Sequence, residues 1–310
     1  TVDDVIVLDP GLTPVAVDSV MVLPPSPVMV VEEFEVTPPN LVLNGDAFVD
    51  GGDLVLTEDS SQVSGSAFFE PIAGGPVVTF SVTFDFRMDP PLSEGEGEFF
   101  DAGNGITLSI LDSATDTPDG LFDAGEQRSF HIGMPTSNGF SFNIELDTLN
   151  NENAGVDPDD NHVGLNLNGD PNSLLTVDPL VDLNDGFTHT AVLDVVGGLL
   201  SFSLDGTPLF VDEPIPGFHP LNPLIGFTAS TGGAVQRHVI ERVDIELTPL
   251  ADTQFLISCP EQSDLGVYQI GIGPGILDAQ TDLPMDQDED GVPGQVGDSF
   301  LGTIEIIPLD

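Results

Sequence analysis

The sequence predicts an all-β protein built as a β-sandwich of the jelly-roll type, and three observations support this fold class. Apolar residues recur with period two in many short segments, 34 glycines and 27 prolines separate these segments, and helical periodicity is nearly absent. A chain of 310 residues, 40% of them hydrophobic, can bury one large core beside a smaller module. Many short strands separated by turn residues are typical of sandwiches and jelly rolls.

The clearest predicted strand is PVVTFSVTFDFRM, residues 76–88. Its apolar side chains from Val78 to Met88 fall on one face, and the polar side chains from Thr79 to Arg87 fall on the other. The same reasoning predicts further strands at 53–57, 105–111, 140–147, 162–167, 188–196, 199–204, 207–211, 223–229 and 237–247.

The chain divides into three zones. Residues 1–39 form an extended N-terminal β arm with three apolar segments separated by prolines, 40–250 form the long strand-rich block, and 251–310 form a short β segment with an acidic loop. The last zone has too few strands for a sandwich, so its open edge needs a cover. The N-terminal arm can supply it within the chain or in a neighbouring molecule. The prolines at 24, 25 and 27 form a stiff spacer, which favours the neighbouring molecule.

The charge is strongly one-sided. The chain carries 53 acidic residues against four arginines and no lysine, a formal net charge of −49. Such a chain repels nucleic acid and anionic membranes and attracts cations, which points to saline or calcium-bearing surroundings outside a cell. A plainer interpretation is that the acidity only maintains solubility. Cys259 is the single cysteine, so no intrachain disulfide is possible, and no apolar run near the start is long enough to span a bilayer.

One acidic stretch, ELDTLNNENAGVDPDDNH, has the composition of a metal loop. It follows a strand in which Glu145 and Asp147 lie on the same face, two residues apart, so both carboxylates can address one point. Asn151 and Asp157 follow in the loop, and His162 begins the next strand. Oxygen ligands suit calcium, and carboxylates with one imidazole suit a transition ion such as manganese. The alternative is a solvated acidic loop.

The order of these residues resembles the metal loop of legume-type (L-type) lectins, E-x-D-x-(Y/F)-x-N followed by D-P and a histidine. Here the pattern reads Glu145, Asp147, Leu149, Asn151, Asp157-Pro158 and His162. The resemblance implies that a transition metal is bound by Glu145, Asp147, Asp157 and His162. It also implies that calcium is bound by Asp147, Asn151, Asp157 and the carbonyl of Leu149.

The resemblance extends over most of 40–250 and implies a concanavalin A-like sandwich. FSVTFDFRM, GNGITLSI, IGFTASTGG and RHVIERVDIEL each resemble a segment of the family, in the family's order. The resemblance assigns Asn151 and Gly232 to the carbohydrate site. Asn104 stands where the family has an aspartate that binds two sugar hydroxyls. Asparagine lacks the charge that strengthens such bonds, so sugar binding is weakened, lost or retuned.

The chain is predicted not to be an enzyme. Laminarinase-type hydrolases share this jelly roll and use E-x-D-x-(x)-E on one strand. Here Leu149 and Asn150 occupy the positions where the second glutamate would stand. The histidines outside the metal loop are scattered and are interpreted as structural or surface residues.

Two further acidic loops are weaker candidates for calcium. Asp286, Asp288 and Asp290 precede a turn glycine, in a stretch that resembles the final strands of bacterial immunoglobulin-like surface modules. Calcium and a solvated turn are equally open there. The stretch TDTPDGLFDAGE offers a similar set: Asp116, Asp119, Asp123 and Glu126.

The sequence therefore predicts a secreted or cell-surface adhesin that binds glycans in a calcium-dependent way. Its cofactors are calcium and manganese or another divalent transition ion. The alternative is a structural subunit of an extracellular fibre or matrix, self-associating by strand donation through the N-terminal arm. Nucleic acid and membrane insertion are excluded as partners.

Overall fold

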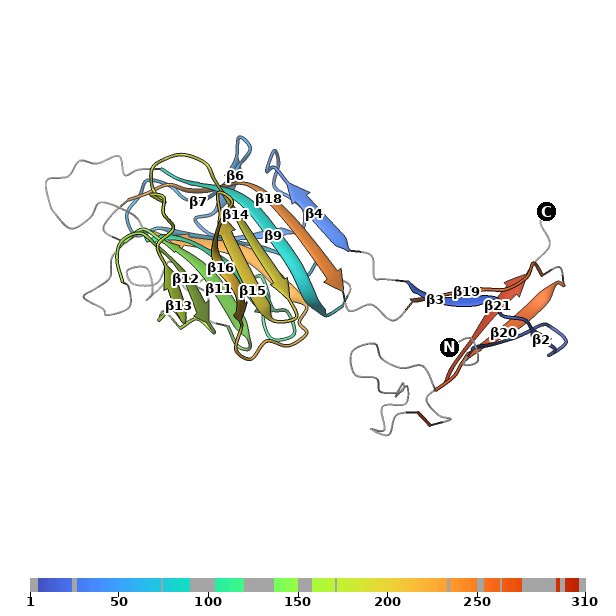
Figure 1. Cartoon of the computed structure of the whole chain (residues 1–310). Helices are drawn as coiled ribbons and strands as arrows, with labels where there is room; N and C mark the ends of the chain where they lie inside the picture. The colour runs from blue at the N-terminus through green and yellow to red at the C-terminus, as the bar shows by residue number, and fades with distance from the viewer. Residues whose placement is uncertain are drawn as a thin grey trace, which may run out of the picture. The chain divides into compact units, whose positions relative to one another are not determined.

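The computed structural model describes residues 5–23, 27–73, 75–89, 104–119, 137–149, 158–170, 172–232, 235–249, 254–262, 264–274, 294–295 and 299–306. These residues form 21 β-strands (Figure 1), and they include no helix that could cross a membrane. The chain divides into a central unit, Ser26–Ala251, and a terminal unit made of Thr1–Pro25 with Asp252–Asp310. The predicted all-β fold class is confirmed.

The central unit is a sandwich of two antiparallel sheets. The seven-stranded sheet has the order β13-β12-β11-β10-β17-β8-β5. Its strands are β5 (Leu41–Gly45), β8 (Ser64–Phe69), β10 (Gly105–Asp112), β11 (Ser141–Asp147), β12 (His162–Leu167), β13 (Leu175–Val177) and β17 (Pro223–Ser230).

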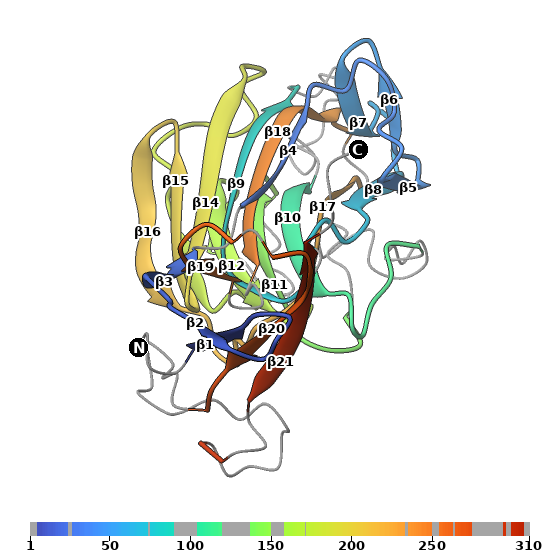
Figure 2. The same ribbon diagram turned by 90° about the vertical axis from the view of Figure 1, so that its right-hand side faces the viewer.

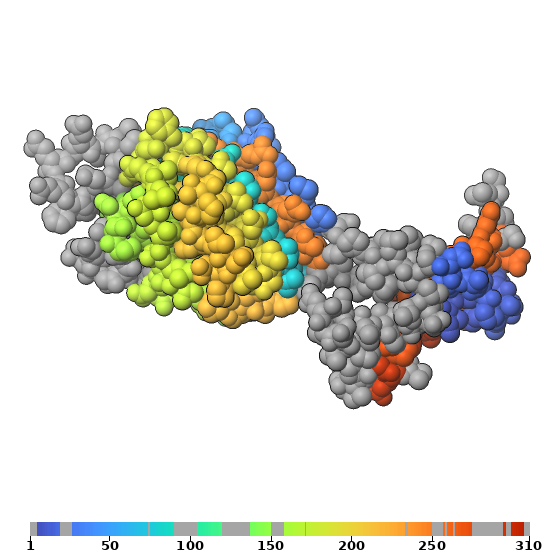
Figure 3. Space-filling model, viewed as in Figure 1, coloured from blue at the N-terminus to red at the C-terminus, as the bar shows by residue number. Residues whose placement is uncertain are grey.

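The eight-stranded sheet has the order β16-β15-β14-β9-β18-β7-β6, and its eighth strand, β4, also pairs with β18. Its strands are β4 (Val28–Glu32), β6 (Phe48–Asp50), β7 (Asp53–Thr57), β9 (Val77–Met88), β14 (His189–Val196), β15 (Leu199–Leu204), β16 (Thr207–Pro214) and β18 (His238–Pro249). Figure 2 shows the strands β16, β15, β14, β9 and β18 side by side in this order. Figure 3 shows the outer surface of β14, β15 and β16 in yellow and orange.

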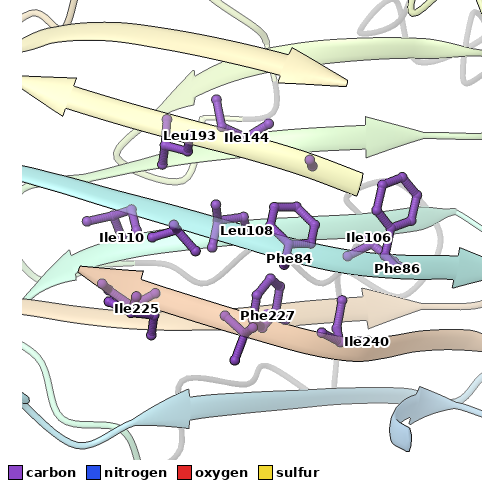
Figure 4. Close-up of a cluster of buried hydrophobic side chains, with 14 of the residues drawn as sticks. Phe84, Phe86, Ile106, Leu108, Ile110, Ile144, Leu193, Ile225, Phe227 and Ile240 are labelled. Atoms are coloured by element: carbon purple, nitrogen blue, oxygen red, sulfur yellow. The ribbon is translucent and has the colours of Figure 1, made fainter. Parts of the chain in front are cut away.

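The core lies between these two sheets because each strand alternates apolar and polar residues. Figure 4 shows Phe84 of β9 close to Leu108 of β10 and Phe227 of β17, and Leu193 of β14 close to Ile144 of β11. The rings of Phe84 and Phe227, from opposite sheets, have centroids 5.1 Å apart. The predicted inward face of β9 is the observed one from Phe80 to Met88. At the start of the strand the register is irregular, and Val77 is buried in place of the predicted Val78.

The strands predicted from the alternation are present. Those at 53–57, 162–167 and 199–204 have the predicted bounds, and the others differ at their ends by one to three residues. Such differences are expected, because strand ends fray into turns whose residues no longer alternate.

The terminal unit is built from both ends of the chain. Its strands are β1 (Val5–Leu8), β2 (Pro14–Val15), β3 (Ser19–Leu23), β19 (Gln254–Ser258), β20 (Gly266–Ile272) and β21 (Phe300–Ile306). β2, β1, β20 and β21 form one sheet in that order, and β3 pairs with β19.

The N-terminal strands thus find partners within the chain, whereas the proline spacer had favoured a neighbouring molecule. β1 pairs with β20, with Val5 opposite Ile272. β4 lies inside the predicted 1–39 arm but joins the central sandwich, with Val28 opposite Leu247 of β18. The immunoglobulin-like character of 251–310 stays a prediction.

Candidate metal and carbohydrate site

Three potential metal ligands meet at one end of the seven-stranded sheet. β11 and β12 are antiparallel neighbours whose register places Asp147 opposite His162 and Glu145 opposite Gly164. Because Glu145 and Asp147 are two residues apart on one strand, all three side chains lie on the same face. Their ligand atoms lie within 4.8 Å of one another, and all three residues are buried. The predicted convergence on one point is therefore present in the structure.

The imidazole of His162 supports a cation at this point. The residue is 1% exposed, yet neither ring nitrogen has a hydrogen-bond partner among the residues that the structure describes. Its Nδ1 lies 3.5 Å from Oδ1 of Asp159. Buried polar atoms normally have partners, because losing water without replacement costs about 1–3 kcal/mol. Two buried carboxylates beside an unpartnered imidazole are a donor set that fits a divalent ion.

Neighbouring residues hold the two carboxylates in place. Ser173 Oγ donates a hydrogen bond to Oε2 of Glu145 over 2.8 Å. A Cβ at Gly164 would lie 2.7 Å from the same Oε2 and 2.6 Å from Ser173 Oγ, so only glycine leaves room for this contact. The backbone N–H of Leu149 donates to Oδ1 of Asp147 over 2.6 Å. Ser173 was not predicted, since nothing in its local sequence links it to Glu145.

Asn104 lies at the same end of the sheet. The next residue, Gly105, is opposite Asp147 on one side and Ser230 on the other. Gly105 has a φ of +111°, and a side chain there would collide with the carbonyl oxygen of Leu146. Asn104 itself is buried, and its Nδ2 donates to Oγ of Ser230 over 2.9 Å. The backbone thus brings Asn104 next to the strand that carries the metal ligands.

Gly232 follows shortly after Ser230, in the loop between β17 and β18. Its carbonyl accepts a hydrogen bond from the N–H of Gln62 over 3.0 Å. The hydroxyl of Thr231 donates to the carbonyl of Ser60 over 2.6 Å. The loop is therefore fixed to the segment between β7 and β8, beside the end of the sheet that carries Asn104.

The remaining predicted site residues are only partly placed. Leu149 is described next to the metal cluster, and the role of its carbonyl stays a prediction. The other five lie outside the described residues: Asn151, Asp157, Asp286, Asp288 and Asp290.

Asp116 accepts hydrogen bonds from two loop segments, and its predicted ion ligation stays a prediction. Its Oδ2 accepts from Thr115 Oγ1 over 2.9 Å and from Ser137 Oγ over 2.7 Å. Its Oδ1 accepts from the N–H and Nδ2 of Asn138 over 2.9 and 3.2 Å. Through these four hydrogen bonds the carboxylate ties two loop segments together.

Comparisons with known proteins agree with this fold. The model of the family described as "Legume lectin domain" matches residues 30–188, slightly more than half of the chain. The probable L-type lectin-domain containing receptor kinase V.3 of Arabidopsis thaliana is 27% identical over 231 residues, covering 64% of this chain. The match spans about a third of that kinase, 32% of its length.

Solved structures show the same fold. The metal-free lectin I-B4 from Griffonia simplicifolia has a TM-score of 0.51 at 19% identity, over 70% of this chain and 98% of that one. The exoplasmic/lumenal domain of VIP36 in its Ca²⁺/Man2-bound form has a TM-score of 0.51 at 14% identity, over 76% and 97% of the two chains. With its concanavalin A-like sandwich and the matched half of its sequence, the chain belongs to the legume lectin domain family.

Proposed function

We propose that this protein binds glycans in a calcium-dependent way and acts as a secreted or cell-surface adhesin, without catalysis. The observation that carries the proposal is the buried cluster of Glu145, Asp147 and the unpartnered His162. The family membership and the Ca²⁺/Man2-bound VIP36 domain with the same fold support it. The net charge of −49 favours surroundings that supply cations.

Two ions fit this end of the sheet. Asp147, together with the predicted ligands Leu149, Asn151 and Asp157, would hold calcium. Glu145 and His162 would complete a neighbouring site for manganese or another transition ion, with Asp147 and Asp157 shared between the two ions. Bound calcium would supply a fixed positive charge next to Asp147, which lies opposite Gly105, the residue after Asn104.

Asn104 decides how strongly a sugar is held. Its Nδ2 is engaged with Ser230, and a neutral amide oxygen is a weaker acceptor than a carboxylate. We therefore expect weak monosaccharide binding. Ser230 Oγ can rotate its hydrogen toward an aspartate, so Asn104→Asp fits the same space and should strengthen sugar binding in calcium. Equal or weaker binding by this variant would remove the 104 position from the sugar site.

The fibre alternative rested on N-terminal strands that lacked partners in their own chain. In the structure β1 pairs with β20 and β3 pairs with β19. The edge that a donated strand would cover is thus occupied from within the chain, which removes the main motive for strand donation.

Metal analysis of the folded protein, followed by a glycan array with calcium or with chelator, tests the proposal. Asp147→Ala should abolish both calcium binding and array signal. Asp178→Ala is a matched control, because exposed Asp178 accepts the same kind of bond from the N–H of Leu180, over 2.8 Å, away from the cluster. A folded wild-type protein that binds no divalent ion, or glycan binding that chelator leaves unchanged, would refute calcium dependence.

A further inference from the structure

A network of buried, hydrogen-bonded polar groups begins at Thr148, the residue that follows Asp147 of the metal cluster. Thr148 Oγ1 donates to Oε1 of Gln236 over 3.2 Å, and Thr57 Oγ1 donates to the carbonyl of Gln236 over 3.1 Å. Thr57 Oγ1 also lies 2.6 Å from Nδ1 of His238. All four residues are at most 2% exposed. They come from three segments that are distant in sequence, so the network joins separate parts of the sandwich.

Thr148 connects this network to the metal ligands. Glu145 and Asp147 point to the metal side of β11, and the alternation sends the next residue, Thr148, toward the interior. A hydroxyl there needs a partner, and Oε1 of Gln236 supplies one. The Asp147–Leu149 turn is thus held on one side by the bond from the Leu149 N–H to Asp147, and on the other by Gln236.

His238, at the opposite end of the network from Thr148, has a defined protonation state. Burial lowers the pKa of His238 to about 3, so the imidazole is neutral at ordinary pH. The hydrogen-bond network assigns the proton to Nδ1, which donates to Thr57 Oγ1, so that the Thr57 hydroxyl donates to Gln236 O. Nε2, which has no hydrogen-bond partner among the described residues, then carries no hydrogen, so no buried N–H is left without an acceptor. The carbonyl of Gln236 is therefore fixed from the side of the eight-stranded sheet.

Gln236 also belongs to the loop that carries Gly232. That loop is fixed at its start by the bonds of Thr231 and Gly232 to Ser60 and Gln62, and at its end by Thr57. Gln236 therefore reaches the metal turn with its side chain while its backbone is anchored with the predicted sugar-contacting loop. Loss of its side-chain hydrogen bond would therefore remove the contact between the metal turn and the Gly232 loop.

We propose that Gln236 is a positioning residue that fixes the Asp147–Leu149 turn for calcium and couples the turn to the Gly232 loop. The inference rests on the proposed calcium-dependent function and names a residue through which the site is assembled. Hydrogen-bond partners behind metal ligands typically change metal affinity 10- to 100-fold when removed. Gln236 acts on the ligands through Thr148, one residue away, so its effect should lie at the low end of this range. Gln236→Met, which keeps the volume but loses the acceptor, should weaken calcium binding about tenfold.

Calorimetric titration of the full chain with calcium chloride, beside melting curves of the metal-free proteins, tests this role. Thr148→Val should weaken calcium binding as Gln236→Met does, and the double variant should bind no more than about twofold worse than the weaker single variant, because both remove one contact. If Gln236→Met does not fold, the near-isosteric Thr148→Val carries the test.

Leu193→Ala is the control for general destabilisation. Leu193 is buried in the hydrophobic core on β14 of the eight-stranded sheet, and its truncation should lower the metal-free melting temperature while leaving calcium affinity unchanged. If the Gln236→Met and Thr148→Val proteins bind calcium within twofold of the wild type, the role of Gln236 is wrong, and the proposed calcium-dependent function is unaffected. A wild-type chain that binds no calcium overturns the proposed function and the inference with it.

Discussion

The central and terminal units use the same antiparallel pairing, but they bury very different amounts of apolar surface. In the central unit one continuous cluster fills the space between two large sheets, and Phe84, Phe142 and Phe227 within it are at most 1% exposed. Each sheet hides the apolar face of the other, so this unit contains its own hydrophobic driving force.

The terminal unit has much less of this burial. Among its described side chains, the buried hydrophobic ones are Val5, Val7, Tyr268 and Ile272. On its last strand, β21, Leu301 is 82% exposed and Ile304 is 57% exposed. The comparison shows that backbone pairing alone does not make two units equally stable. We expect the central unit to fold by itself and the terminal unit to depend on the meeting of the chain's two ends.

The largest effect should come from deleting residues 1–25. The deletion removes β1 and β3, which pair with β20 and β19, while the central unit loses no strand. Limited proteolysis with mass spectrometry should show rapid cleavage within 252–310 and a resistant 26–251 core. Protection of β20 and β21 equal to that in the full chain would show that the terminal unit does not depend on the N-terminal strands.

A core truncation should separate the two units next. Phe84→Ala opens a cavity in the central core and should destabilise that unit by about 3–5 kcal/mol. Val7→Ala in the terminal unit removes less buried apolar surface and should cost about 1.5 kcal/mol. Chemical denaturation with a probe in each unit should show each substitution shifting its own transition. A common shift of both transitions would mean that the units unfold as one.

Calcium removal should act on one unit only. An ion that binds the folded state stabilises it by about 2.7 kcal/mol when free ion is a hundredfold above its dissociation constant. Chelator should lower the melting transition of the central unit, and Asp147→Ala should abolish this response. A terminal transition that also falls would instead locate a calcium site in the 286–290 loop.

The smallest effect should be the acid sensitivity conferred by His238. All five histidines lie between 131 and 238, so none belongs to the terminal unit. Burial lowers the pKa of His238 from 6.5 to about 3, so the unfolded state binds the proton more readily. Its contribution to stability is therefore complete above pH 6.5 and falls as the pH drops toward 3. At pH 5.5 the loss is about 1.4 kcal/mol.

The measurement is the free energy of unfolding in chelator at pH 7.5 and 5.5, for the wild type and His238→Gln. The variant should lose less stability between the two pH values than the wild type does. Chelator is needed because acid would otherwise also release metal from the carboxylates of the cluster. Identical losses in the two proteins would show that His238 is not the group that confers the acid sensitivity.

The sequence predicts local features of this fold well. Alternation marks β9 and β15 because one face of each strand is buried and the other is less so. The metal cluster is predictable for the same reason, since Glu145 and Asp147 are two residues apart and His162 begins the next strand. Short strands such as β13, Leu175–Val177, carry too few residues for a pattern and were not predicted.

Contacts between distant segments could not be predicted, because they leave no pattern in the local sequence. Ser173 reaches Glu145, and Gln236 reaches Thr148, without any spacing rule that connects them. The pairing of β1 with β20 could not be told from pairing with a neighbouring molecule, because strand edges offer the same backbone groups in both cases.

The pairing of Val28 with Leu247 has a consequence for the order of assembly. Before the central unit folds, the two halves of the terminal unit stand at the ends of a flexible loop, and closing a loop on the order of 200 residues costs about 5 kcal/mol. Once β4 lies beside β18, most of that loop is already closed, because Val28 and Leu247, from which the chain leads to the terminal unit, are paired. The terminal unit should therefore form last during refolding, with a rate that follows completion of the sandwich.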